Sequence, residues 1–103
     1  MYGSPVGSVL VTADGASITV DKQKGEGVRV FNVHIISGAG GGAVVSFKNG
    51  GASDTIWLKE TGTASTGKTF DYGVNGVFFT NGCYVDVDTN TTSVLVNCRK
   101  ELA

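Results

Sequence analysis

Short apolar runs rich in β-branched residues, each ended by glycine, constrain the fold more than any other feature of this sequence. The chain has 103 residues, of which 16 are glycine and one is proline, so glycine is used about twice as often as average. The glycines follow no fixed period, which excludes a collagen-like repeat and indicates many turns. No stretch long enough for a helix keeps a helical apolar stripe without glycine or dense β-branching. The sequence therefore predicts strands and turns.

The runs between the glycines predict nine short strands. Their expected positions are residues 8–13, 16–21, 27–37, 43–48, 54–60, 68–72, 75–80, 83–88 and 93–99. Many short strands separated by turn signals are typical of a sandwich or a barrel. We therefore expect an all-β fold: a compact antiparallel β-sandwich, jelly-roll-like, with eight to nine short strands. A chain of this length forms one domain, with residues 1–7 as a flexible N-terminal arm and residues 8–103 as the sandwich.

Residues 62–69 read GTASTGKT and match the phosphate-binding string G-x-x-x-x-G-K-[ST] in full. A P-loop needs a helix that opens at its lysine, so that backbone N–H groups and the helix N-terminus converge on the phosphates. The residues after Lys68 and Thr69 are FDYGVNGVFFTNGCYV, whose glycines, aromatic and β-branched residues favour strands. We therefore predict a β-hairpin turn here, with no bound nucleotide and no cofactor.

The last two expected strands flank a polar loop and predict a hairpin. A four-residue loop between them would set Cys83 opposite Cys98, with the valines of both strands on the same face. The other face, which includes Tyr84 and Leu95, is then the solvent side. Two cysteines opposed in this way reach the short end of disulfide geometry. For a chain made in the cytosol, however, we expect a pair of free, buried thiols.

Two expected strands carry apolar residues on both faces. With regular alternation, residues 27–37 place three apolar side chains on each face, and Phe78 and Phe79 point in opposite directions. A two-layer sandwich covers one face of each sheet, so another copy of the chain is the economical cover for the second face. The segment MYGSPVG suits an arm that reaches across such a contact. The predicted interface consists of Tyr2, Pro5, Val28, Val30, Ile36 and Phe78.

The charge and the N-terminal sequence argue against several classes of partner. The formal net charge is −1 and the basic residues are scattered, so the chain has no electrostatic footprint for phosphate backbones. The apolar run at residues 9–11 is too short for a signal-peptide core or a membrane span. We therefore expect a soluble protein made in the cytosol, with neither nucleic acid nor membrane as a direct partner.

Other candidate sites have simpler structural explanations. His34 lies in the middle of an expected strand, and we interpret it as a packed or hydrogen-bonded side chain instead of a catalytic base. Asp86, Asp88 and Asn90 begin like a calcium loop, but the sixth and twelfth positions lack the required glycine and glutamate. No nucleophile-elbow pattern supports hydrolytic chemistry. The sequence predicts no catalytic residue and no metal site.

The sequence from GVRVFNVHIISGAGGGAVVSFKNG to TIWLKETGTASTGKTFDYGVNGVFFTNGCYVDVDTNTTSVLVNCRKE resembles small virion proteins of tailed bacteriophages. The resemblance covers about residues 27–100 and rests on an RV-x-x-V-x-I strand, a glycine loop, a G-V-x-F-x-x-G-x-Y-V-D-V motif and a final valine strand. It implies a self-associating jelly roll or related sandwich that decorates or cements a capsid, or that belongs to a tail or fibre. It carries over no catalytic residue, because such proteins act through binding surfaces.

The expected function is therefore that of a non-enzymatic virion structural protein, made in the host cytoplasm. A capsid decoration or cement subunit fits best, acting as a homo-oligomer, with a trimer favoured, on the major capsid protein or another virion protein. The alternative is a carbohydrate-binding module of a tail fibre or other receptor-binding assembly, for which Trp57, Tyr72 and Tyr84 could stack on sugars. Because Trp57 lies between two aliphatic residues, core or interface is the favoured place for it. A P-loop or hydrolytic enzyme is the third, least favoured class.

Overall fold

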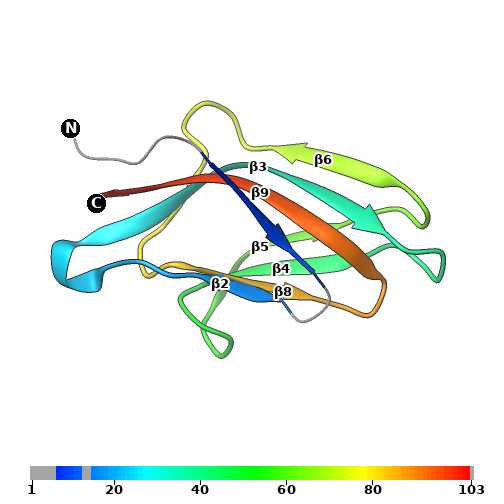
Figure 1. Cartoon of the computed structure of the whole chain (residues 1–103), viewed down its shortest axis with the longest axis horizontal. Coiled ribbons are helices and arrows are strands. Elements are labelled where there is room, and N and C mark those ends of the chain that lie inside the picture. Colours follow the sequence, from blue (N-terminus) through cyan, green and yellow to red (C-terminus); the bar gives the residue numbers. More distant parts are fainter. Residues whose placement is uncertain (1–6, 13–14, 103) are drawn as a thin grey trace.

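The computed structural model describes residues 7–12 and 15–102, which form nine strands and one 3₁₀ turn, η1 (Figure 1). Each strand overlaps one of the nine expected from the sequence. The 3₁₀ turn was not expected; the Asp21 carboxylate accepts a hydrogen bond from the Gln23 N–H at its start, and Gly25 ends it with a left-handed φ of 71°. The elements in chain order are β1 (Gly7–Val11), β2 (Ala16–Ile18), η1 (Lys22–Lys24), β3 (Glu26–Ser37), β4 (Val44–Asn49), β5 (Ile56–Thr61), β6 (Gly67–Asp71), β7 (Val77–Phe79), β8 (Cys83–Val87) and β9 (Thr91–Leu102).

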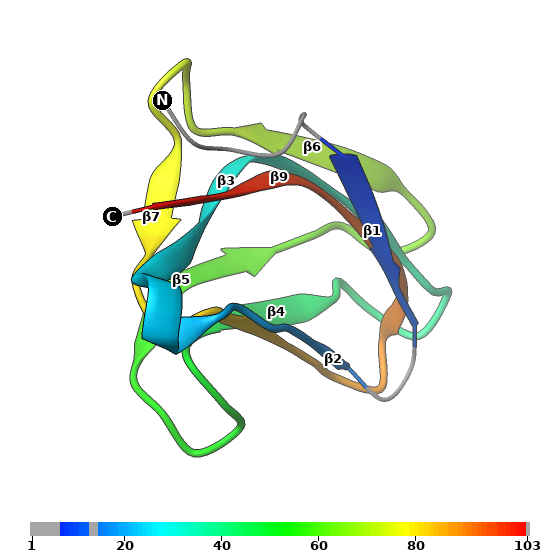
Figure 2. The same cartoon turned by 60° about the vertical axis from the view of Figure 1, so that its left-hand side comes forward.

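The strands form two antiparallel sheets that pack face to face (Figure 2). Sheet A has the order β1-β9-β3-β6, with β7 also paired to β3, and sheet B has the order β2-β8-β4-β5. The chain passes repeatedly from one sheet to the other, so neighbours in the sequence are often not neighbours in a sheet. Two four-stranded sheets connected in this way form a jelly roll, to which β7 is added. The predicted fold is confirmed.

Alternate residues of the strands fill the space between the sheets. In β9, for example, Val94, Val96 and Cys98 are buried while the residues between them are only partly covered. β-Branched side chains suit this position because they pack well on a pleated surface. The buried apolar residues are Val11, Ile18, Val28, Val30, Val33, Ile35, Ala43, Val45, Phe47, Phe79, Cys83, Val85, Val94, Val96 and Cys98.

A bulge in β3 explains why its apolar residues had seemed to need two covered faces. The register with β9 shifts between Val30 and Asn32, so Phe31 is the extra residue. A bulge reverses the alternation beyond it, and Val28 and Val30 therefore face the same core as Val33. Both valines have no exposed surface. Their predicted place in an interface is wrong, because the chain covers them itself.

The predicted hairpin between the last two strands is also wrong in its pairing. β8 pairs with β2 and β4 in sheet B, whereas β9 pairs with β1 and β3 in sheet A. The connection between β8 and β9 therefore crosses from one sheet to the other. Cys83 and Cys98 do not lie on neighbouring strands; they enter one core from opposite sheets. The inward orientation of both, and of the valines beside them, was predicted correctly.

Candidate interaction surfaces

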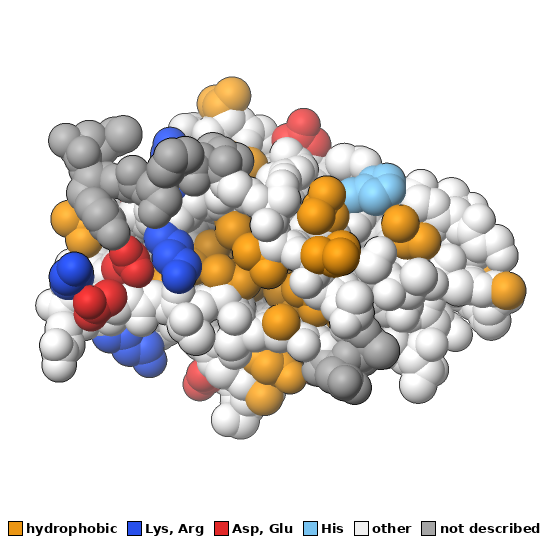
Figure 3. Space-filling model, viewed as in Figure 1, with side chains coloured by type: hydrophobic (Ala, Val, Ile, Leu, Met, Phe, Trp, Pro, Cys, Tyr) orange, Lys and Arg blue, Asp and Glu red, His pale blue; other side chains and the backbone are white. Residues whose placement is uncertain are grey.

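The outer face of sheet A carries an apolar patch that extends from the edge strand β1 across β9 to β3. Leu10 of β1 lies directly opposite Leu95 of β9, and Leu95 in turn lies opposite His34 of β3. Ile36 follows two residues after His34 on the same face. Leu10 is 63% exposed and Ile36 is 39% exposed. We call Leu10, Leu95 and Ile36 the outer apolar patch; in Figure 3 hydrophobic side chains adjoin the pale blue histidine, which is the single one in the chain.

The centre of this patch carries no charge, although Asp71, which lies opposite Asn32 in the next row, is exposed on the same face. His34 Nδ1 makes a 2.7 Å hydrogen bond with Thr69 Oγ1 on β6, which agrees with its interpretation as a hydrogen-bonded side chain. The adjacent row contains Asn97, whose side chain donates to the Asn32 side chain. An uncharged centre with exposed aliphatic side chains favours a partner surface of the same kind. Of the predicted interface residues, Ile36 belongs to this surface, whereas Tyr2 and Pro5 lie outside the described residues.

A charged and aromatic cluster occupies the other end of the same face. Glu101 accepts hydrogen bonds from Arg29 Nε at 2.7 Å and from Arg99 Nε at 3.0 Å. The Arg29 guanidinium lies 4.8 Å from the centre of the Phe78 ring, and that of Arg99 lies 5.4 Å from the Phe31 ring. Phe78, predicted as an interface residue, is thus partly covered by Arg29. The cluster joins β3, β7 and β9, and its main effect is to hold these strands together.

The GTASTGKT segment lacks the structure of a P-loop. Its first part connects β5 of sheet B to β6 of sheet A, so it is not the hairpin turn that we predicted, and Lys68 lies within β6. Three of its backbone N–H groups donate to carbonyl oxygens of the protein: Gly62 to Ala43, Ser65 to Gly38, and Thr66 to Thr63. Because these groups point to the protein, they cannot also converge on a phosphate. The absence of a helix after Lys68 was predicted correctly.

The acidic residues of the apparent calcium loop are engaged within the protein. Asp88 Oδ1 accepts from the Asn90 N–H and from Thr91 Oγ1, which is the pattern of a turn. Asp86 Oδ2 lies 3.0 Å from Lys48 Nζ. Within the described residues, no group of three or more His, Cys, Asp or Glu side chains could hold a metal ion.

The three candidate sugar-binding aromatics do not form one platform. Trp57 stacks on Phe79 with a centroid distance of 5.7 Å and closes one side of the sandwich. Tyr72 donates a 2.7 Å hydrogen bond to Glu60, and burial together with this bond raises the pKa of its hydroxyl. Tyr84 lies on β8, where Lys48 Nζ is 6.0 Å from its ring centre.

Both cysteines are free, buried and unreactive in character. Burial raises the pKa of Cys83 to about 12, and the nearby Cys98 thiol adds to this effect. Burial also raises the pKa of Cys98, although Lys100 opposes the shift. The thiolate is the reactive form of cysteine, so neither side chain is suited to act as a nucleophile at neutral pH.

Comparisons with known proteins identify the fold but no family. No family model and no curated protein matches the sequence. Among solved structures, the chain is similar to one from Bacillus endospore appendages, which form a novel family of disulfide-linked pili. The TM-score is 0.52 at 14% sequence identity, and the match covers 99% of this chain and 88% of the other. In the part of the chain that the structure describes, no helix has the length and apolar character needed to cross a membrane.

Most of the outer apolar patch was not expected from the sequence. Leu95 was assigned to the solvent side, and Leu10 was not singled out. A signal was present in SVLVTA, where Val9 and Val11 alternate with Leu10, so that one of three aliphatic residues had to face outward. That run does not reveal which strand lies beside β1. It therefore could not show that Leu10 has Leu95 as a neighbour.

Proposed function

We propose that this protein is a non-enzymatic structural subunit that works by associating with copies of itself. The observation that carries the proposal is the outer apolar patch, whose exposed aliphatic side chains extend across β1, β9 and β3 of a sheet whose other face is fully used by the core. Two such patches would cover each other's exposed aliphatic side chains without placing a charge at the centre of the contact. The structural neighbour, a pilus protein, supports the same class of function.

The proposed setting is a virion, in which the subunit decorates or cements the head of a tailed bacteriophage. The sequence resemblance over residues 27–100 supports this setting, and a jelly roll suits it because the fold offers broad sheet faces for contact. The partners would be further copies and the major capsid protein. A contact between identical patches gives pairs, so the trimer favoured from the sequence would need a further contact. A second candidate is a subunit of a pilus-like appendage, which the fold of the endospore protein favours. The glycan-binding alternative has no such support, since its aromatic residues are dispersed.

Sedimentation velocity at micromolar concentration tests self-association. The unmodified chain should sediment as an oligomer, and Leu10→Ser should shift it toward monomer. Burial of one leucine side chain contributes about 2 kcal/mol. A contact between two identical patches loses two of them, so the dissociation constant should rise roughly 1,000-fold. Val74→Ser is the matched control, because Val74 is 90% exposed on a turn away from the patch. An unmodified chain that remains monomeric would refute the proposal.

Binding to purified particles separates the two settings. A decoration subunit should bind undecorated phage heads in stoichiometric amounts, whereas an appendage subunit should form filaments by itself. If purified virions contain no copies of the chain, the virion setting is wrong even if self-association holds.

A further inference from the structure

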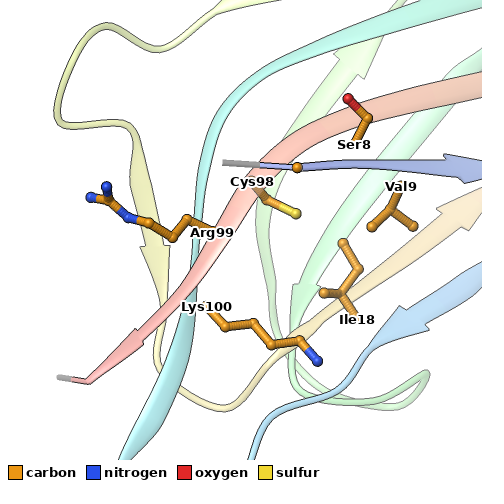
Figure 4. A pocket seen from close by; sticks show the side chains of 7 residues that line it. Ser8, Val9, Ile18, Cys98, Arg99 and Lys100 are labelled. Carbon is orange, nitrogen blue, oxygen red and sulfur yellow. The ribbon is translucent and has the colours of Figure 1, made fainter. Parts of the chain in front are cut away.

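Among the described residues, one side of the sandwich is uncovered and contains a cavity. β1 and β2 form the edges of sheets A and B on this side, and the cavity between them has a volume of about 290 Å³. Figure 4 shows the side chains of Val9, Ile18 and Cys98 directed into the same space. In Figure 3 hydrophobic side chains are visible in a hollow on this face. The residues that line the cavity are Gly7, Ser8, Val9, Ile18, Cys98, Arg99 and Lys100.

Size and charge restrict what this cavity can bind. Its volume falls just below the range of about 300–1,000 Å³ that is usual for small-molecule sites, so it suits one or two side chains better than a cofactor. The floor is apolar. Lys100 extends past Ile18 (Figure 4), and its ammonium group forms no ion pair with the described residues. Arg99, by contrast, is paired with Glu101. The cavity therefore fits an apolar side chain with a carboxylate close to it.

The opposite side of the sandwich offers a group of this kind. There, the Trp57 and Phe79 rings close the gap between the sheets. Ile56 and Trp57 lie next to each other on the free edge strand β5 and are 47% and 44% exposed. Asp54 is exposed two residues before Ile56. An aliphatic and an aromatic side chain beside a carboxylate complement the apolar cavity and the ammonium group of Lys100.

We propose that the β5 edge of one copy docks into the cavity between β1 and β2 of the next copy, with Asp54 near Lys100. This inference rests on the proposed self-association and identifies a second contact for it. The two surfaces are different and lie on opposite sides of the subunit, so the contact is heterologous. Contacts of this type propagate into rings or filaments, whereas a contact between identical patches closes after two copies. With both contacts, the subunit can extend into an array.

Two variants remove the two halves of this contact separately. Gly7→Trp places a large side chain at the cavity, at a position where an added Cβ meets no atom within 4 Å. Ile56→Ser removes an exposed aliphatic group from the β5 edge without opening the core. Each variant should weaken the growth of large assemblies at least about tenfold. Val74→Ser, which removes another exposed aliphatic group, should leave growth unchanged.

Mixing the variants decides whether the contact is heterologous. The Gly7→Trp chain keeps its β5 edge, and the Ile56→Ser chain keeps its cavity, so one intact contact can form between them. Native mass spectrometry should show a mixed species, one step larger than either variant gives alone, and isotope labelling of one variant would identify it. If mixing gives no species larger than either variant forms alone, or if the single variants assemble like the unmodified chain, the inference is wrong.

A charge variant probes the same contact independently of added bulk. Lys100→Glu should weaken assembly about fivefold by placing two carboxylates together, and added salt should reduce the difference. Unchanged assembly of the Lys100→Glu chain would contradict the placement of Asp54 near Lys100. If the chain self-associates and none of the three substitutions changes its assembly, this inference is refuted but the proposed function is not. If the unmodified chain stays monomeric, both are refuted.

Discussion

Replacing Glu101 by glutamine removes the negative charge that holds Arg29 and Arg99 together on the outer face of sheet A. Hydrogen bonds to charged groups contribute about 1.5–3 kcal/mol when buried, whereas exposed ion pairs contribute about 0–1 kcal/mol. Glu101 is 13% exposed, and the arginine side chains are 27% and 28% exposed, so an intermediate value applies. We expect Glu101→Gln to lower the free energy of unfolding by about 2 kcal/mol, which lowers Tm by roughly 10 °C in a domain of this size.

The loss of stability caused by Glu101→Gln should also depend on pH. Burial alone would raise the pKa of Glu101, but the hydrogen bonds from Arg29 and Arg99 outweigh it and hold this pKa below its ordinary value. A carboxylate with a lowered folded pKa stabilises the protein above its unfolded pKa of about 4.3, and this stabilisation disappears as the pH falls through the folded pKa. Urea unfolding of both chains should therefore show a full difference at neutral pH and a smaller one in acid.

Asp86→Asn is the matched control for this prediction. It also removes an ion pair, with Lys48, but Asp86 is 49% exposed, so the change should stay within about 0.5 kcal/mol. If Glu101→Gln has an effect this small at neutral pH, or if its effect is the same in acid, the cluster does not stabilise the fold as argued.

Three further outcomes follow from the geometry. Calorimetric titration with ATP and magnesium should show no binding, and Lys68→Ala should change nothing; micromolar binding that this substitution abolishes would contradict the structure of the GTASTGKT segment. Cys83 and Cys98 should react slowly with a thiol reagent until denaturant is added, and fast labelling of the native chain would mean that the core is open. Gly76→Ala should lower the free energy of unfolding by at least about 1–2 kcal/mol, measured by thermal circular dichroism, because φ is 57° and the new Cβ would lie 2.4 Å from the Val30 carbonyl oxygen.

Local sequence patterns predicted the strands well because each strand needs only its own residues to be recognised. Glycine marked the turns, and β-branched residues marked the runs between them. The bulge at Phe31 could not be predicted in this way. It changes which face each residue occupies, yet in RVFNV it shows only as two consecutive apolar residues, which a strand covered on both faces would show as well. The apolar residues on both expected faces of β3 did indicate an unusual feature. Its cause was a shift of register and not a second interface.

The pairing of the strands was harder to predict from the sequence than their positions. A polar four-residue connection suits a hairpin, and the loop before β9 has the length and composition of one. In a jelly roll, however, the same connection can cross between sheets, and the choice depends on which strands arrive beside β8 and β9 from elsewhere in the chain. The candidate surfaces also depend on strand pairing that the sequence does not reveal. The outer apolar patch brings together residues from β1, β3 and β9, and the cavity needs both β1 and β2.

The central position of β9 in sheet A has a consequence for how the protein folds. β9 separates β1 from β3, and pairs such as Gly7 with Cys98 join residues that are far apart along the chain. Closing such long loops costs entropy before any contact compensates for it, and folds dominated by distant pairings take milliseconds to seconds to form. During synthesis, the inward faces of β1 and β3 must wait for β9 to emerge from the ribosome. A truncated product would thus lack the surfaces for assembly, so that only finished subunits could enter an array.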